Sequence, residues 1–341
     1  MRHAAKPPFT LNLGLQGGGA HGAFTWGVLD ALLADGRIAF DGVSGTSAGA
    51  MNAVVLAHGL RRGGRDAARA ALEKFWHGVA EKTPFEIVLP SADGKDFRLN
   101  PAVKMLLGLT HYLSPSQLNP FEFNPLRDLL AEQIDFPALR QRSPVRLFIA
   151  ATHANSGKLR LFRENELDID VVLASACLPT LHRAVTIAGE PYWDGGYSAN
   201  PAVFPLIYQC RAEDTLLVLL TPLRHEATPD SAADIKMRTL DIAFNAAFLR
   251  EMRMFADLRE VVDRSWLHIG RLERRIACAR FHVIAADELI NALGTDTKLA
   301  ANLQFFEMLR DRGREHARTW IEDGLPRVGR QSTANLRELF C

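Results

Sequence analysis

A serine with a glycine two residues away on each side is the clearest chemical pattern in this 341-residue chain. Residues 45–49 read Gly-Thr-Ser-Ala-Gly, which places Ser47 at the centre of a G-x-S-x-G motif. In many acyl-transfer enzymes this motif is a sharp turn that exposes the serine hydroxyl as a nucleophile. Gly45 and Gly49 have to be small because neighbouring backbone passes close to them. Ser47 is therefore the candidate nucleophile.

The residues around Ser47 have the pattern that such a turn requires. Residues 38–40 form a short extended run before it, and residues 48–56 form an apolar helical run after it. A serine at the start of a helix lies near unpaired N–H groups and the positive end of the helix dipole, which favour developing negative charge. A chance match would be an ordinary Gly- and Ser-rich helix start, but the strand–turn–helix context favours catalysis.

A second glycine turn precedes the serine turn. Residues 10–16 predict a first strand and residues 23–34 a helix, and residues 17–22 between them read Gly-Gly-Gly-Ala-His-Gly. The successive backbone N–H groups of such a loop can bind a phosphate or an oxyanion.

Residues 17–22 also match the G-x-G-x-x-G fingerprint of dinucleotide binding, in which such a loop binds phosphate. Asp41 even lies roughly 20 residues further on, where that motif places a ribose-binding acid. That acid should follow the second strand, whereas here the second strand leads into the serine turn. A second glycine turn has no role in dinucleotide binding, but acyl transfer needs a nucleophile facing oxyanion donors. Acyl transfer is therefore favoured.

Three motifs in this order resemble those of the patatin-like lipid acyl hydrolases. The glycine loop comes first, the serine turn follows about 25 residues later, and Asp194-Gly195-Gly196 lies far downstream. Residues 174–179, which read Ala-Ser-Ala-Cys-Leu-Pro, are similar to that family's short helix-and-proline block. The resemblance covers about residues 10–222. His21 departs from it, since the family usually carries Arg or Lys there; packing or helix capping is the expected role of His21.

The resemblance implies a fold. It predicts a three-layer α/β/α sandwich with a mostly parallel central sheet, formed by residues 1–222. Residues 223–341 are expected to form a helical C-terminal extension that packs on the same domain.

The resemblance also implies a mechanism, in which Ser47 attacks the carbonyl of a lipid-like ester and forms an acyl-serine intermediate. Asp194 would accept the serine proton directly, as the second member of a dyad. The oxyanion would be bound by the backbone N–H groups of Gly17, Gly18 and Gly19. No metal and no cofactor is expected, and the partner is a lipid or another acyl-ester substrate.

Two alternatives stay open. One is a Ser-His-Asp esterase, for which the candidate bases are His225, His268, His282 and His316. That fold places its serine after several strands, whereas Ser47 follows the second. The other is a catalytically silent lipid- or partner-binding protein of the same fold.

Residues 83–124 form an insertion that is longer than an ordinary connecting loop and rich in proline and large apolar residues. They predict either a lid and acyl-chain slot, with Leu106 and Leu107 in contact with the chain, or an accessory helical layer.

The rest of the chain predicts further elements. Residues 61–65 read as a breaking turn and residues 327–341 as loosely ordered chain. The expected helices and strands are helix 66–79, helix 125–133, strand 145–152, strand 158–162, helix 170–176, an extended segment 191–193, strand 214–221, a long helix 237–262, strand 280–284 and helix 299–321.

Composition excludes several classes of protein. With 40 basic and 39 acidic residues the net charge is +1, so the basic footprint of a nucleic-acid-binding protein is missing. Four widely spaced cysteines do not make a disulfide framework, which favours a reducing compartment. No apolar run approaches the roughly 20 residues of a membrane span. A soluble cytoplasmic protein is expected, with transient contact at a membrane surface as a further expectation from the lipid substrate.

Overall fold

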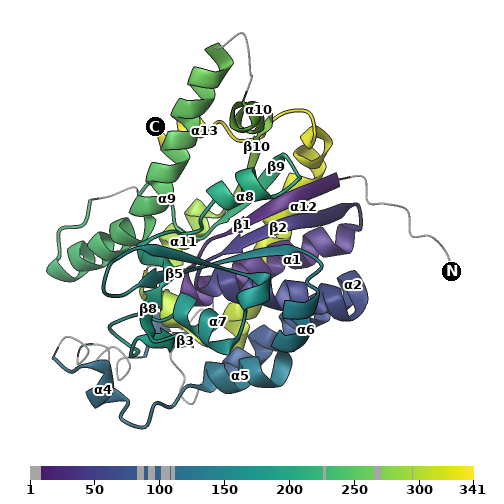
Figure 1. Cartoon of the computed structure of the whole chain (residues 1–341). Helices are drawn as coiled ribbons and strands as arrows, with labels where there is room; N and C mark the ends of the chain where they lie inside the picture. Colours follow the sequence, from purple (N-terminus) through teal and green to yellow (C-terminus); the bar gives the residue numbers. More distant parts are fainter. Residues whose placement is uncertain are drawn as a thin grey trace.

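The computed structural model describes residues 9–82, 88–90, 97–100, 108, 112–225, 228–264, 270–293 and 295–341. Within these residues an eight-stranded mixed sheet forms the centre of the molecule (Figure 1). Its strands, in order across the sheet, are β10 (Arg280–Ala285), β9 (Asp214–Leu219), β1 (Phe9–Leu15), β2 (Ile38–Gly45), β5 (Arg146–His153), β8 (Glu190–Asp194) and β7 (Val185–Ile187), with β6 (Leu159–Arg163) also paired to β5.

The five strands from β10 to β5 are parallel to one another, and β6, β7 and β8 join by antiparallel pairing. All six residues of β9 are buried. A parallel strand with no exposed side chain needs helices on both faces of its sheet.

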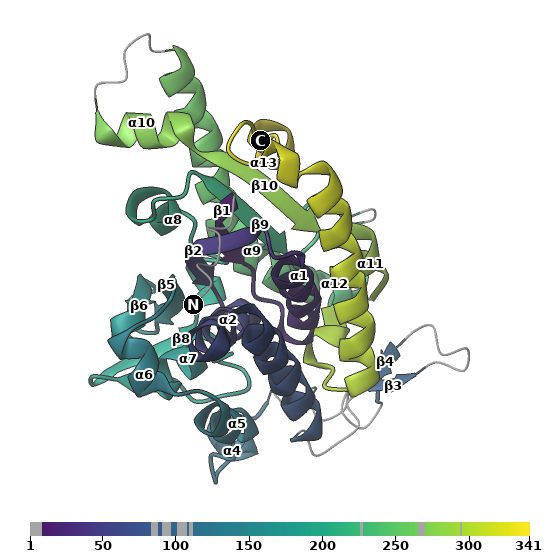
Figure 2. The same cartoon turned by 90° about the vertical axis from the view of Figure 1, so that its right-hand side faces the viewer.

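Helices cover both faces (Figures 1 and 2). One face packs against the larger hydrophobic core and the other against a smaller one. The helices of the larger core are α1 (Gly22–Asp35), α2 (Ala48–Glu81), α5 (Pro125–Gln133), α6 (Phe136–Gln141), α7 (Ile169–Ser175) and α12 (Leu303–Asp323). Those of the smaller core are α8 (Phe204–Gln209), α9 (Ala232–Arg264) and α13 (Leu336–Phe340). The predicted three-layer α/β/α fold with a mostly parallel sheet is confirmed.

Several sequence predictions match the elements closely. Helix 125–133 has the predicted bounds, and the long helix and the strand at 280–284 are α9 and β10 with longer ends. The breaking turn at 61–65 is a sharp bend inside α2, where Gly63 and Gly64 leave helical geometry.

Two predictions at the C-terminal end were wrong. The closing helix begins at Leu303 rather than at residue 299, because the Asn302 side chain caps it by accepting from Phe305 N–H at 3.1 Å. The tail 327–341 is not loose chain: Thr333 and Ala334 donate backbone hydrogen bonds to Phe281 of β10. Apolar periodicity in the sequence does not predict these contacts or the packing of α13 on α9.

The insertion at 83–124 is described only in part. Its described residues include a two-stranded antiparallel ribbon, β3 (Val88–Pro90) with β4 (Phe97–Leu99), and the short helix α4 (Pro115–Leu118). Leu106 and Leu107 lie outside the described residues. Remaining short elements are α10 (Arg271–Cys278) and α11 (Asp287–Leu293). None of the helices in the described ranges is both long and apolar enough to cross a bilayer.

The C-terminal third shares the sheet and the core with the rest of the chain. It supplies β10 at the sheet edge and α12, which lies along α1 (Figure 2). The buried carboxylate of Asp30 on α1 binds Arg69 of α2 at 2.8 Å and Arg314 of α12 at 2.7 Å. The division of the chain at residue 222 stays a prediction.

The close crossing of α1 and α12 gives a test of this packing. A Cβ on Gly313 would lie 2.1 Å from the carbonyl oxygen of Phe24. Gly313→Val should therefore lower the free energy of unfolding by about 1–3 kcal/mol through overpacking. Thermal unfolding measures the effect, with Arg318→Val at an exposed position of the same helix as control. Equal stability of the two variants would contradict the tight crossing.

Candidate active site

Ser47 occupies a strained turn between β2 and α2. Its backbone angles are φ 54° and ψ −122°, a left-handed conformation that is uncommon for a residue with a side chain. The flanking glycines are required sterically, since a Cβ on Gly45 would lie 2.5 Å from Gly49 O, and one on Gly49 would lie 2.1 Å from Leu15 O. The glycine spacing of the motif therefore follows from close backbone contacts, as expected for a nucleophile turn.

Hydrogen bonds from distant segments hold this turn in place. The Ser47 N–H donates to Ser175 Oγ at 3.0 Å, at the end of α7. The neighbouring Thr46 donates from its hydroxyl to Ala199 O at 2.8 Å and from its N–H to Leu15 O at 3.3 Å. Strain of this kind persists only where the surroundings fix the backbone, and it is common at active sites.

Asp194 ends β8, and its carboxylate is hydrogen-bonded to the Ser47 side chain. Its side chain is buried, with 1% of the residue exposed, and it accepts the Gly196 N–H at 2.7 Å. The Asp194 backbone is held on both sides, by Cys177 O at 2.8 Å and by the Thr152 hydroxyl at 2.8 Å. The two residues of the predicted dyad, 147 positions apart in the sequence, are thus in contact.

Burial raises the pKa of Asp194 from its ordinary value of 3.8 to about 7, although the hydrogen bonds from Gly196 and Ser47 lower it. A pKa near neutrality suits a general base, because the carboxylate is then partly ionised and also a good proton acceptor. The arrangement can remove the Ser47 proton without a histidine.

The glycine loop lies directly beside the nucleophile. A Cβ on Gly17 would be 2.9 Å from Ser47 Cβ, so only glycine fits there. The Gly17 N–H donates to Asn200 Oδ1 at 2.7 Å and is therefore already occupied. Within the described residues the N–H groups of Gly18 and Gly19 have no hydrogen-bond acceptor. Of the three predicted oxyanion donors, these two are available.

Residues outside the sequence motifs support the glycine loop. Buried Gln16 accepts from the N–H groups of Leu220 and Thr221 at 2.6 and 2.9 Å, and it donates to Asn245 Oδ1 on α9 at 2.8 Å. One turn of α9 also covers the Asp-Gly-Gly motif, because a Cβ on Gly196 would lie 2.2 Å from the Phe244 ring. In the sequence, the one feature that sets Gln16 apart is that it is a polar residue at the end of an apolar strand.

His21 does not take part in proton transfer. It is fully buried, its Nε2 is 2.8 Å from Thr297 Oγ1, and burial, with Lys298 nearby, lowers its pKa to about 3. The ring is therefore neutral at physiological pH, and the glycine loop carries no charge from it.

The other candidate bases that the structure describes lie away from Ser47. His282 Nε2 is hydrogen-bonded to Oδ1 of Asp214, at the start of β9, at 3.1 Å. His316 packs against the ring of Phe24 on α1. His225 lies near Asp241, and His268 is outside the described residues. None of the described histidines has a hydrogen bond to Ser47.

Asp41, the candidate ribose acid, accepts the backbone N–H groups of Arg211 and Ala212 and so fixes a loop of the fold. Among the described residues, no group of three or more His, Cys, Asp or Glu side chains could hold a metal ion.

A comparison with models of known protein families agrees with the motifs. The family model of the patatin-like phospholipases matches residues 13–207, more than half of the chain and a region that contains all three motifs. The solved structure of VipD from Legionella pneumophila is similar at 17% identity and a TM-score of 0.41, covering 93% of this chain and 67% of that one. No curated protein matches the sequence. The family-model match over more than half of the chain shows that the chain belongs to the patatin-like phospholipase family.

Proposed function

We propose that the protein is a serine acyl hydrolase that cleaves ester bonds of lipid-like substrates with a Ser-Asp dyad. The observation that carries this proposal is the hydrogen bond between Ser47, in its strained turn, and the buried carboxylate of Asp194. Membership of a phospholipase family supports a lipid ester as substrate. A protein that only bound lipid would have no use for a strained serine beside a buried, high-pKa carboxylate.

The geometry supports a two-step reaction. Ser47 Oγ attacks the ester carbonyl carbon while its proton passes to Asp194, and the alcohol leaves with that proton. A water molecule then gives a proton to Asp194 and attacks the carbonyl carbon of the acyl-serine. Asp194 returns that proton to Ser47 Oγ as the bond to the acyl group breaks, which releases the acid and regenerates both residues. The oxyanion of each tetrahedral intermediate would be bound by the N–H groups of Gly18 and Gly19, and one such donor typically contributes about 2.7–4 kcal/mol.

The positions of exposed apolar residues support contact with a lipid surface. Tyr112, Phe121 and Phe123, near α4, are 85%, 92% and 61% exposed. Ile235, Ile242 and Leu249 are exposed at seven-residue intervals along α9. Both α4 and this part of α9 lie at the left of Figure 1. A water-soluble surface rarely exposes so many large apolar side chains without a binding function.

The dyad predicts a specific pH dependence. Since Asp194 must be ionised to accept the proton, kcat/KM on p-nitrophenyl acetate should fall about tenfold per pH unit below about pH 7 and level off above it. Asp194→Asn keeps the shape but cannot act as a base, and should lower kcat by about 10²- to 10⁴-fold. A histidine variant that folds normally and is as inactive as Ser47→Ala, beside an active Asp194→Asn, would refute the dyad.

A stability measurement separates this effect from misfolding. Folding raises the pKa of Asp194 from 3.8 to about 7, so between these values the folded protein holds a proton that the unfolded chain has released. The free energy of unfolding therefore falls as the pH rises through this window. At about pH 8 Asp194→Asn should melt at a higher temperature than the wild-type protein, and at about pH 4 the two should be similar.

The surface contact has its own test. Replacing Tyr112 and Phe121 together by Ser should weaken sedimentation with phosphatidylcholine vesicles at least about fivefold, because two exposed rings no longer enter the interface. Leu339→Ser, at an exposed position of α13, is the control. Unchanged vesicle binding in the double variant would show that this segment is not the contact surface.

A further inference from the structure

The glycine loop packs against a turn from the C-terminal third of the chain. Part of the loop is a 3₁₀ turn, Gly19–His21, and it contacts a second 3₁₀ turn, Thr295–Leu299. We propose that Thr297 and Lys298 in this second turn are positioning residues, which hold the N–H groups of Gly18 and Gly19 where they can bind the oxyanion. The inference rests on the proposed function and adds two residues to its machinery.

The backbone of the second turn touches the loop directly. A Cβ on Gly19 would lie 2.2 Å from Lys298 O, and Gly19 has φ 58°, in the left-handed region. Glycine adopts this conformation without steric cost, but it also leaves the backbone free to move. The place of the Gly19 N–H therefore depends on where the backbone of Lys298 lies.

A buried hydrogen bond joins the same two turns. Thr297 Oγ1 lies 2.8 Å from His21 Nε2, and within the described residues this is the one side-chain hydrogen bond made to residues 18–21. Both residues are buried, and His21 Nδ1 has no partner in the described structure. A ring with its proton on Nε2 leaves a lone pair rather than an N–H unpaired at Nδ1, so His21 donates to Thr297. Without the Thr297 hydroxyl this donor would be buried and unsatisfied, which favours a shift of the ring and of the loop that carries it.

The second turn is itself fixed on α9. Lys298 Nζ is 2.7 Å from Asp241 Oδ1, and the two side chains are only 22% and 9% exposed. Asn245, one helical turn further along α9, is the residue that bonds Gln16 at the start of the glycine loop. One stretch of α9 thus holds the loop directly at Gln16 and, through Lys298, at Gly19.

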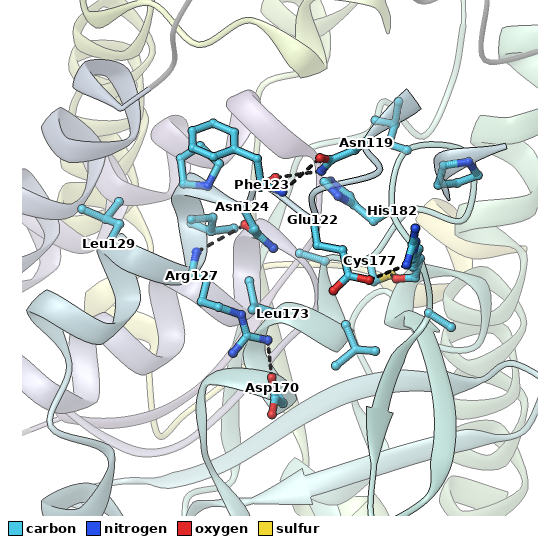
Figure 3. Close-up of a pocket in the computed structure, with 18 of the residues that line it drawn as sticks. Asn119, Glu122, Phe123, Asn124, Arg127, Leu129, Asp170, Leu173, Cys177 and His182 are labelled. Atoms are coloured by element: carbon cyan, nitrogen blue, oxygen red, sulfur yellow. Dashed lines mark hydrogen bonds and ion pairs between the residues drawn. The ribbon is translucent and has the colours of Figure 1, made fainter. Parts of the chain in front are cut away.

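An exposed ion pair elsewhere offers a matched comparison for Lys298 and Asp241. Arg127 and Asp170 pair at the wall of a cavity of about 560 Å³, which is lined by residues of α2, α5 and α7 among others (Figure 3). Its described lining includes no residue of the glycine loop and none of residues 295–299. Exposed pairs of this kind contribute little, so the Arg127 charge should have no effect on the oxyanion donors.

The first test compares Thr297→Val, which removes the hydroxyl at nearly constant volume, with Thr297→Ser, which keeps it. Thr297→Val should lower kcat on p-nitrophenyl acetate at least about tenfold and leave KM within about twofold, because misplaced donors weaken the transition state alone. The midpoint of the pH profile should stay at its wild-type value, since Asp194 is untouched. Thr297→Ser should keep kcat within about threefold of wild type. Thr215→Val is the control, because Thr215 is buried and its hydroxyl has no partner in the described structure.

A double variant shows whether Thr297 acts through His21. In His21→Leu protein the hydrogen bond is already absent, so adding Thr297→Val should lower kcat by less than about twofold. The full loss on adding Thr297→Val to His21→Leu, a wild-type kcat in Thr297→Val, a shifted pH midpoint, or Thr297→Ser as impaired as Thr297→Val would overturn the positioning role of Thr297.

The ion pair is tested separately. Lys298→Met leaves the largely buried Asp241 carboxylate without this cation and should lower kcat at least about fivefold. Arg127→Met removes a cation of the exposed pair and should keep kcat within about twofold of wild type. Equal kcat values in the two variants would overturn the role of Lys298.

The position of the loop can also be measured without catalysis. The ¹⁵N order parameters of the Gly18 and Gly19 amides should fall in Thr297→Val and keep their wild-type values in Thr297→Ser. If the wild-type protein hydrolyses no ester, this pattern still supports the positioning role while the proposed function fails. Order parameters that are equal in all three proteins would overturn the positioning role.

Discussion

Burying the carboxylate of Asp194 against the Ser47 hydroxyl is the constraint on which the rest of the site depends. A buried carboxylate without a cation is costly unless hydrogen bonds compensate it, and here they come from Gly196 and from Ser47 itself. The compensation is incomplete, since burial still raises the pKa of Asp194 to about 7. Because burial costs the ionised carboxylate more than its hydrogen bonds return, Asp194 accepts a proton readily and can act as a base near neutral pH.

Holding this pair together takes contacts from most of the chain. The Gly17–Asn200, Ser47–Ser175 and Gln16–Asn245 hydrogen bonds join residues that are 183, 128 and 229 positions apart. Through the last of them α9, which follows the region matched by the family model, is part of the support of the glycine loop. This arrangement explains why the C-terminal third shares one core with the motifs.

The sequence predicted the parts of the site that depend on local backbone geometry. Gly45, Gly49, Gly17 and Gly19 are required because a larger residue at any of these positions would clash with neighbouring atoms, so their spacing is visible in the sequence. Ser175, Asn200 and Gln16 could not be assigned, because their roles arise only when distant segments meet. For the same reason the occupation of the Gly17 N–H by Asn200 could not be foreseen.

The most direct test of this account is to locate the reactive residue chemically. A fluorophosphonate probe, followed by peptide mapping by mass spectrometry, should modify Ser47 alone, because among the serines that the structure describes it is the one that combines a strained turn with a hydrogen bond to a buried base. Labelling should disappear in Ser47→Ala and become much slower in Asp194→Asn. Labelling of another serine, or labelling that persists in folded Ser47→Ala protein, would contradict the assignment of Ser47 as the nucleophile.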